Sequence, residues 1–397
     1  MVLRFLETSD YRNLDGGRLE FSDGINLLYG HNAAGKTNTL EALYLFAAGR
    51  SFRTRNEREL VRIGKDSTHI KIGFDRNGVS RTMSAGYMLS GASGCTRRMK
   101  VDSAVADRVS EFLGVFRAVL FTPDHLDLVK GAPEGRRHFV DAALCQIKPG
   151  YIKSLNRYEK VLSERNAYLR RVKYGEVKPD KEYLDVTSTL LSQNAAVIIK
   201  QRASYISLLA EHAANMYGYL TGEKEKLFCE YSGFSKNIKY DDEKLCAKAL
   251  EEHYARSYER DMSLGRTFSG PHRDDLLVYI SNSRLEFEDN DENDEAEQGR
   301  LAARTFGSQG QQRSAVLALK LAEGEIVKQL TGEYPVFLLD DLFSELDENR
   351  RNKLVSLFGD RQAVITSCEE AFLSQADNVY PIKVEGGKHF AGCKKSE

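Results

Sequence analysis

The sequence predicts an α/β protein in which both ends of the chain contribute strands to one sheet and a long helical segment is inserted between them. Three observations support this prediction. An apolar, strand-like run at residues 25–29 enters a glycine-rich loop, and a second apolar run at residues 336–339 ends in two aspartates. Between these runs, residues 133–218 carry long stretches of helical periodicity with few prolines.

Length and composition predict a soluble protein of several domains that stays in the cytoplasm. The chain has 397 residues, 41% of them apolar, which is enough for a large core and at least two domains. No apolar run reaches the ~18 residues that a membrane span needs, and the first residues lack a secretion signal. The six cysteines are scattered without metal-ligand spacing, so we expect reduced thiols and neither disulfides nor a zinc site.

The N-terminal region is expected to form strands and one helix. Apolar and polar residues alternate through much of the first forty residues, which indicates strands. Residues 37–48 carry apolar side chains at helical spacing directly after the glycine-rich loop. Residues 68–121 have a mixed pattern, with short strands expected around residues 69–74 and 119–121.

The inserted segment is expected to form a helical arm. Apolar residues recur at helical spacing over residues 133–171 and 182–218. Two antiparallel helices of roughly 20 to 35 residues would project about 30 to 50 Å at ~1.5 Å of rise per residue. A strand-like run returns at residues 276–280. The expected domains are a discontinuous head of residues 1–130 and 270–397, and a helical lobe of residues 131–269.

A complete GxxxxGK[ST] pattern follows the first apolar strand and precedes the first helix. It comprises Gly30, His31, Asn32, Ala33, Ala34, Gly35, Lys36 and Thr37. Glycines allow backbone N–H groups to surround phosphate oxygens, Lys36 can reach the β- and γ-phosphates, and the Thr37 hydroxyl can ligate Mg²⁺. The alternative is a chance match, but the strand–loop–helix setting argues against it. The motif therefore predicts binding of ATP and Mg²⁺.

The second apolar run has the pattern of a Walker B strand. A carboxylate at the carboxyl end of a strand beside a phosphate-binding loop can hold Mg²⁺, and we assign this role to Asp340. The next residue, Asp341, is the candidate general base that would deprotonate the attacking water. The alternative, a strand that ends in solvated acids, is weak beside an intact phosphate-binding loop.

Residues 305–313 resemble the signature motif of ABC ATPases. Ser308, Gly310 and Gln311 occupy matching positions, and Gln309 replaces a glycine. A serine and a small backbone at a helix N-terminus form a second anion site, although a glutamine-rich helix cap is the simpler alternative. Asp347 matches the D-loop that follows Walker B and is expected to contact a second subunit. Because the signature motif of that family contacts the nucleotide of a partner subunit, the resemblance implies an ATP-dependent homodimer.

The order and spacing of the motifs restrict the class of ABC protein. Roughly 300 residues separate Walker A from Walker B, which is more than in a transporter head and less than in an SMC protein with a full coiled coil. Segments across almost the whole chain are similar to the RecF family. These segments are residues 11–14, 49–54, 121–126, 133–137, 269–276 and 308–313. The expected fold is therefore an ABC-type ATPase head, with a P-loop mixed sheet and an antiparallel β-subdomain, that carries an inserted helical arm.

The sequence departs from the pattern in two places. Residues 286–297 form an acidic stretch where the family has a short hairpin, and we infer no function from it. Residues 364–367 stand where transporters carry a switch histidine, so a γ-phosphate sensor of that kind is in doubt. Slow hydrolysis agrees with this departure.

The resemblance implies a weak, DNA-stimulated ATPase that binds single- and double-stranded DNA at gaps. It further implies cooperation with RecO and RecR in loading the RecA recombinase onto a strand coated by single-strand-binding protein. Three other functions are weighed against this one. An SMC-like DNA tether would need a hinge domain between the arm helices, a transporter subunit would need membrane partners, and a nuclease would need metal ligands beyond the Mg²⁺ site.

Candidate DNA contacts come from a local basic run, because the net charge of −1 gives no overall attraction to nucleic acid. The run comprises Arg50, Arg53, Arg55, Arg58, Arg62 and Lys65. The alternative is a solvated helix face on which Glu57 and Glu59 pair with the arginines. Arg12 and Asn13 are expected to contact adenine or ribose, as the resemblance implies. His272 is either catalytic or part of a structural turn.

Overall fold

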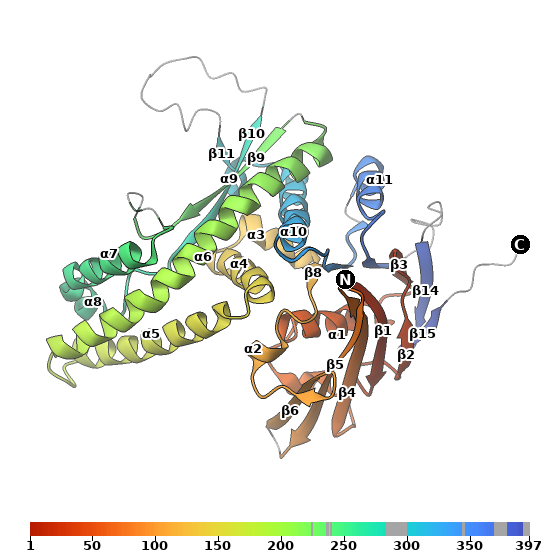
Figure 1. The fold of residues 1–397 in the computed structure, drawn as a ribbon, viewed down its shortest axis with the longest axis horizontal. Coiled ribbons are helices and arrows are strands. Elements are labelled where there is room, and N and C mark those ends of the chain that lie inside the picture. Colours follow the sequence, from red (N-terminus) through yellow and green to blue (C-terminus); the bar gives the residue numbers. More distant parts are fainter. Residues whose placement is uncertain are drawn as a thin grey trace, which may run out of the picture. The chain divides into compact units, whose positions relative to one another are not determined.

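The computed structural model places most of the chain. The described residues are 1–91, 93–223, 225–235, 238, 240–282, 300–343, 346–368 and 379–391, so the acidic stretch 286–297 lies outside them. The chain divides into a first unit, Met1–His125 with Leu317–Glu397, and a second unit, Leu126–Val316. Figure 1 labels the helices and strands of both units. In the described parts of the chain, no helix combines the length and the apolar character that crossing a membrane requires.

The first unit contains a mixed sheet assembled from both ends of the chain. Its strands, in spatial order, are β15 (Lys388–Ala391), β14 (Val379–Glu385), β3 (Ile25–Tyr29), β13 (Ala363–Ser367), β12 (Val336–Leu339) and β8 (Ala118–Phe121). All neighbours are parallel except the edge strand β15. Since β3, β12 and β13 are parallel and in register, their carboxyl ends meet at one edge of the sheet. The Walker A and Walker B motifs begin at this edge.

A second sheet in the same unit is antiparallel, as expected for the β-subdomain. Its strands, in spatial order, are β2 (Gly17–Glu20), β1 (Val2–Ser9), β4 (Ser67–Arg76), β5 (Val79–Ser90), β6 (Gly94–Val101) and β7 (Ala104–Val105). Alternate residues of β5, such as Met83 and Ala85, are buried, whereas their neighbours are at least partly exposed, and β4 follows the same pattern from Ser67 to Ile72.

Helix α1 (Lys36–Ala48) is buried on nearly all sides and shares a core with both sheets. Leu43 of α1, Ile72 of the antiparallel sheet and Leu338 of the mixed sheet belong to this one core. A helix with apolar residues all round is stable only when covered on every side. The remaining short helices of this unit are η1 (Glu57–Leu60), α2 (Val109–Phe112), η2 (Pro123–Leu126) and α11 (Glu348–Leu357).

The second unit consists of helices around a small sheet. Its helices are α3 (Asp127–Lys130), α4 (Pro133–Ile147), α5 (Tyr151–Lys173), α6 (Lys181–Thr221), α7 (Glu243–Arg256), α8 (Tyr258–Leu264) and α9 (Ala303–Phe306). Its strands, in spatial order, are β11 (Leu301–Ala302), β10 (Asp275–Asn282) and β9 (Glu225–Ser232). Helix α10 (Gln309–Thr331) begins in this unit and ends in the first.

The arm is a hairpin of two long helices that contact each other, α5 and α6 (Figure 1). At 41 residues, α6 is about 60 Å long at ~1.5 Å per residue. The helical pattern over residues 133–171 is divided between α4 and α5 at residues 148–150. Pro149 explains the division, because the residue before a proline is disfavoured in helical conformation.

The boundary between the units differs from the one that the sequence suggested. The sequence placed residues 270–316 with the head, whereas in the structure they lie in the second unit. The reason is strand pairing, because β10 pairs along its whole length with β9, from Asp275 opposite Ser232 to Asn282 opposite Glu225. This pairing joins residues that follow the arm to a strand that precedes α7.

Candidate nucleotide site

The phosphate-binding loop connects β3 to α1, and two of its positions require glycine. Gly30 has φ 151°, and a Cβ there would lie 2.1 Å from the carbonyl oxygen of Val384. Gly35 has φ 118°, and its Cβ would lie 2.8 Å from the Leu14 side chain. Side chains are excluded from both ends of the loop, so its backbone is free to approach a phosphate group.

The functional lysine of the loop lies at the start of α1. The Lys36 ammonium donates hydrogen bonds to the carbonyl oxygens of Gly30 at 2.6 Å and His31 at 2.9 Å. Its charge is therefore held over the loop, beside the N-terminus of the helix, and both features favour an anion. Residues His31, Asn32 and Ala33 are exposed, which leaves the tip of the loop open to solvent.

Two threonines and one aspartate meet where β12 and β13 end beside α1. The Asp340 carboxylate accepts hydrogen bonds from Thr37 Oγ1 at 3.0 Å and from Thr366 Oγ1 at 2.8 Å. Burial raises the pKa of Asp340, and the hydroxyl hydrogen bonds act in the opposite direction. This set of hard oxygen ligands fits Mg²⁺. The sequence predicted Thr37 and Asp340 together, but it gave Thr366 no role.

The candidate general base, Asp341, follows Asp340 directly in the sequence. The backbone N–H of Asp341 donates to Thr366 Oγ1 at 2.9 Å, so one threonine contacts both members of the aspartate pair. Asp341 has φ 48°, a left-handed conformation that costs a non-glycine residue roughly 1 kcal/mol. The hydrogen bond to Thr366 helps to hold this turn, which ends β12 immediately after Asp340.

Asn13 and Arg12 lie against the loop and α1, respectively. The Asn13 amide donates to the Ala33 carbonyl at 2.9 Å and accepts from Asn38 at 2.6 Å. The Arg12 guanidinium forms two hydrogen bonds, of 2.9 and 2.7 Å, with Glu41, which is fully buried in α1. Both side chains support the nucleotide loop in the structure, and their contact with adenine or ribose stays a prediction.

The turn and the last strand of the β14–β15 hairpin support the same loop, which the sequence did not reveal. The backbone N–H of Gly387 donates to the Ala34 carbonyl at 3.1 Å. The imidazole Nε2 of His389 lies 2.8 Å from Thr39 Oγ1, whose hydroxyl also lies 3.1 Å from the Gly35 carbonyl. Burial lowers the pKa of His389 to about 4, so the ring is neutral at pH 7. The Gly386–Gly387 pair could have signalled a turn, but not its contact with residue 34.

The predicted signature motif lies in the second unit, at the start of α10. Ser308 Oγ accepts from the Gln311 N–H at 3.3 Å, and the Gln311 side chain accepts from the Ser308 N–H at 2.8 Å. This reciprocal pair is a capping box. The helix-cap interpretation is therefore observed, and it agrees with an anion site because Ser308 is exposed at a helix N-terminus.

Comparisons with known proteins identify the family. The model of the RecF/RecN/SMC N-terminal domain matches residues 2–389. The chain is 36% identical over 392 residues to a DNA replication and repair protein RecF of Ruminiclostridium cellulolyticum, covering 98% of each chain.

The chain belongs to the RecF family.

Solved structures agree with this assignment. A structure described as the recombination mediator protein RecF with ATP in the RecFOR pathway has a TM-score of 0.85 and 31% identity, with coverage of 98% of this chain and 97% of the other. The Smc head domain of Pyrococcus furiosus is similar at a TM-score of 0.55 and 14% identity, which indicates a shared fold alone. The ABC-type head expected from the sequence is thereby confirmed.

In this RecF-family chain the residues of the basic run between α1 and β4 make separate contacts and do not form one cluster. Arg53 donates to the Asn38 side chain and lies 3.9 Å from Glu41, and its charge also lowers the pKa of Asp340. Arg58 donates to the carbonyls of Gly91 and Gly94. Ion pairs join Arg62 to Asp15 and Lys65 to Asp10, whereas Arg50 and Arg55 are exposed.

Much of the basic run is therefore engaged within its own unit, and Arg53 belongs to the nucleotide site. The run also does not form the helix face considered as the alternative, because its only helix is the single turn η1. DNA contact by the six residues of the run stays a prediction.

The D-loop is described only in part, because residues 344–345 lie outside the described residues. Asp347 caps α11 by accepting from the Arg350 N–H at 2.9 Å, and its other carboxylate oxygen pairs with the Arg350 guanidinium at 2.9 Å. About half of its side chain is exposed. The predicted contact with a second subunit would have to form alongside this cap.

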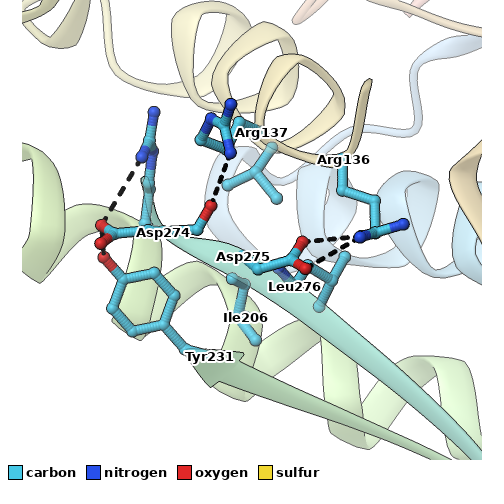
Figure 2. Close-up of a pocket in the computed structure, with 9 residues that line it drawn as sticks. Arg136, Arg137, Ile206, Tyr231, Asp274, Asp275 and Leu276 are labelled. Carbon is cyan, nitrogen blue, oxygen red and sulfur yellow. Dashed lines mark hydrogen bonds and ion pairs between the residues drawn. The ribbon is translucent and has the colours of Figure 1, made fainter. Parts of the chain in front are cut away.

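The motif at residues 269–276 organises the interior of the second unit (Figure 2). Asp275 pairs with the Arg136 guanidinium at 2.7 and 2.8 Å, and the Asp274 carbonyl accepts from Arg137 at 2.8 Å. The buried Asp274 carboxylate accepts from the Tyr231 hydroxyl and lies 3.7 Å from Arg202. The cavity among these residues measures about 10 Å³, room for no more than one water molecule.

His272 has a structural environment. Its Nδ1 lies 2.7 Å from the Tyr158 hydroxyl, and its Nε2 lies 3.1 Å from the Thr267 carbonyl. Burial lowers the pKa of His272 to about 4, so the neutral ring donates from Nε2 and accepts at Nδ1. A Cβ at Gly270 would lie 2.5 Å from the Tyr158 hydroxyl oxygen. These contacts favour the structural turn over a catalytic role.

Proposed function

We propose that this chain is a recombination mediator that uses ATP to control its assembly on gapped DNA in the cytoplasm. In this function it works with RecO and RecR to load RecA onto a strand coated by single-strand-binding protein. The observation that carries the proposal is the arrangement of the Walker A loop, Thr37 and Asp340 in the first unit, in a chain that is 31% identical to an ATP-bound recombination mediator, with 98% of this chain covered. The activity that follows is a weak ATPase stimulated by DNA.

Different residues of the first unit bind different parts of ATP. The loop from Gly30 to Gly35 presents backbone N–H groups to phosphate oxygens, and Lys36 supplies a cation at the β- and γ-phosphates. Thr37 and Asp340 would hold Mg²⁺, which would supply positive charge to the phosphates. Thr366 keeps the Asp340 carboxylate in place through the 2.8 Å hydrogen bond. The β14–β15 hairpin also holds the phosphate-binding loop in place.

Asp341 acts as the general base of hydrolysis. It follows the metal-binding aspartate directly, and its backbone is positioned by Thr366 at 2.9 Å. A carboxylate there accepts the proton of a water molecule that attacks the γ-phosphate. Arg53 donates a hydrogen bond to Asn38, lies 3.9 Å from Glu41 and acts through its charge on the pKa of Asp340. It therefore adds positive charge near the phosphates.

A second copy of the chain completes the site. The exposed Ser308 and the adjacent Gly310 offer a helix N-terminus to the γ-phosphate held by the partner, and the exposed Phe306 lies beside them. ATP binding then favours a dimer, and hydrolysis releases it, because ATP binds more tightly when both motifs contact it. In this proposed dimer, the partner's Asp347 lies at the same interface.

Two other functions are less well supported. An SMC-like tether needs a hinge domain between its arm helices, but α5 and α6 are joined directly by residues 174–180, all of them described. A transporter subunit is disfavoured by the family assignment, since the matched relatives are DNA replication and repair proteins.

Light scattering with and without ATP and Mg²⁺, followed by addition of gapped duplex DNA, tests the proposal. We expect a monomer that becomes a dimer with ATP and then binds DNA. The Ser308→Arg protein should remain monomeric while still binding ATP, and the Lys36→Met protein should fail at both steps. A wild-type chain that stays monomeric with ATP and ignores DNA would refute the proposed function.

A further inference from the structure

The outer face of the antiparallel sheet carries a group of cations that belong to none of the sequence motifs described above. Residues of β4, β5 and β6, which are neighbouring strands (Figure 1), alternate between the core and this outer face. Lys71 of β4 and Arg98 and Lys100 of β6 lie on the outer face, and we call these three residues the cationic sheet face. Arg98 is exposed, and the two lysines are partly exposed.

Strand register brings the three cations close together. Ser84 of β5 pairs with Lys71 on one side and with Lys100 on the other. Gly86, two residues further along, pairs in the same way with His69 and Arg98. Strands lie ~4.8 Å apart, so Lys71 and Lys100 are separated by about 10 Å with only a serine between them. The small residues of β5 leave room for the long cationic side chains, and the Lys71 ammonium lies 5.8 Å from the centre of the Phe5 ring.

The local charge is strongly positive. A third row, Ser67, Met88 and Thr96, completes a block of nine residues that contains no carboxylate. Among the described residues, no acidic group lies within ion-pair distance (4.0 Å) of Lys71, Arg98 or Lys100. The nearest acidic strand residue in register is Glu7 of β1, opposite Lys71, and Glu7 already pairs with Arg18 at 3.0 Å.

This arrangement differs from that of the other cations of the first unit. Arg53, Arg58, Arg62 and Lys65 contact carboxylates, an amide or carbonyl groups of their own unit. Lys71 and Lys100 lie two strands apart, and among the described residues no carboxylate within ion-pair distance offsets their charge. The cationic sheet face therefore has the charge of a surface that binds an anionic partner.

We propose that the cationic sheet face binds the phosphate backbone of duplex DNA, a proposal that rests on the DNA-binding function proposed above. Lys and Arg side chains on a flat surface contact phosphates without reading bases, so the binding is independent of sequence. Single-stranded DNA needs aromatic side chains on which its bases stack, and the nine residues of the block include none except the imidazole of His69. The duplex beside a gap is therefore the expected ligand.

The test compares two triple variants of the full chain that remove the same charge. One is Lys71→Gln/Arg98→Gln/Lys100→Gln, and the matched control is Lys153→Gln/Arg157→Gln/Lys160→Gln on the exposed side of α5. Fluorescence anisotropy with a labelled duplex, a labelled single strand and a gapped duplex gives the affinity of each protein over a range of salt concentrations. Binding of a fluorescent ATP analogue confirms that both variants fold.

The sheet variant should bind duplex at least tenfold more weakly than wild type and lower the slope of log affinity against log salt by about 2 to 3, close to ~0.9 per lost phosphate contact. The control variant should retain most of the affinity and the slope. Equal losses in both variants, or a loss confined to single-stranded DNA, would overturn the proposal while leaving DNA binding itself established. A wild-type protein without affinity for any of the three DNAs would instead remove the proposed function.

Discussion

The Walker A loop and the signature-like motif of this chain are built in opposite ways. The Walker A loop is supported from several directions within the first unit, by Asn13, by the Gly387 backbone and by the Thr39–His389 contact. The signature motif of the second unit is an exposed helix start whose serine and glutamine bond mainly to each other. The first motif is preorganised to bind ATP alone, whereas the second is open on the side where a partner would lie. The difference indicates that binding and assembly can be separated by mutation.

The largest effect on ATP binding is expected at the motif that is supported within one unit. Lys36→Met removes the cation that faces the β- and γ-phosphates and should lower ATP affinity by more than about 100-fold. Isothermal titration with ATP and Mg²⁺ measures this directly. An affinity within tenfold of wild type would mean that Lys36 does not contact the phosphates.

Two variants should lose later steps while binding survives. Asp341→Asn should lower the rate of hydrolysis by about 10²- to 10⁴-fold, the usual contribution of a general base. Ser308→Arg should block dimer formation, since a long cation replaces the helix cap that we propose meets the partner's nucleotide. Both proteins should bind ATP with nearly wild-type affinity. Normal ATP-dependent dimerisation of the Ser308→Arg protein would contradict the shared site.

A smaller effect is expected from the residue that supports the loop from the C-terminal hairpin. His389→Ala removes the contact with Thr39 and should weaken ATP binding by about 3- to 10-fold, the value of one neutral hydrogen bond. His389→Gln places an amide near the position of the imidazole Nε2 and should restore most of the affinity. If both variants lose the same affinity, the hydrogen bond is not the cause.

The smallest effect concerns acid stability. His272 and His389 have pKa values lowered by burial from 6.5 to about 4, so the unfolded state binds protons more readily than the folded state between these values. Folded stability is therefore full above pH 6.5 and falls as the pH is lowered toward 4, by roughly 1 to 2 kcal/mol per histidine at pH 5. Urea titrations from pH 7.5 to 5 should show a shallower decline for His272→Gln than for wild type.

The features that the sequence predicted are those encoded in continuous segments. The loop from Gly30 to Thr37 and the run that ends at Asp340 each carry their chemistry in a few adjacent residues, and β-sheet topology only has to bring two such segments together. The helical arm was predicted for the same reason, since periodicity is a local property. Its division at Pro149 is also a local effect, although the periodic pattern concealed it.

The missing features depend on pairs of residues that are distant along the chain. Thr366 reaches Asp340 across neighbouring strands, and His389 lies 350 positions from Thr39. The boundary of the second unit depends on the pairing of β10 with β9. The cationic sheet face needs the register of three strands, because Lys71 and Lys100 are not neighbours in any local pattern.

The hairpin of β14 and β15 has a consequence for synthesis of the protein. The phosphate-binding loop leaves the ribosome early, but the residue that supports Thr39 follows 350 positions later. At ~5 to 20 residues per second, the interval is about 20 to 70 s. During that time the nascent loop lacks both the strand pairing of β3 with β13 and β14 and the contact with His389. We therefore expect an incomplete chain to bind ATP more weakly than the finished protein.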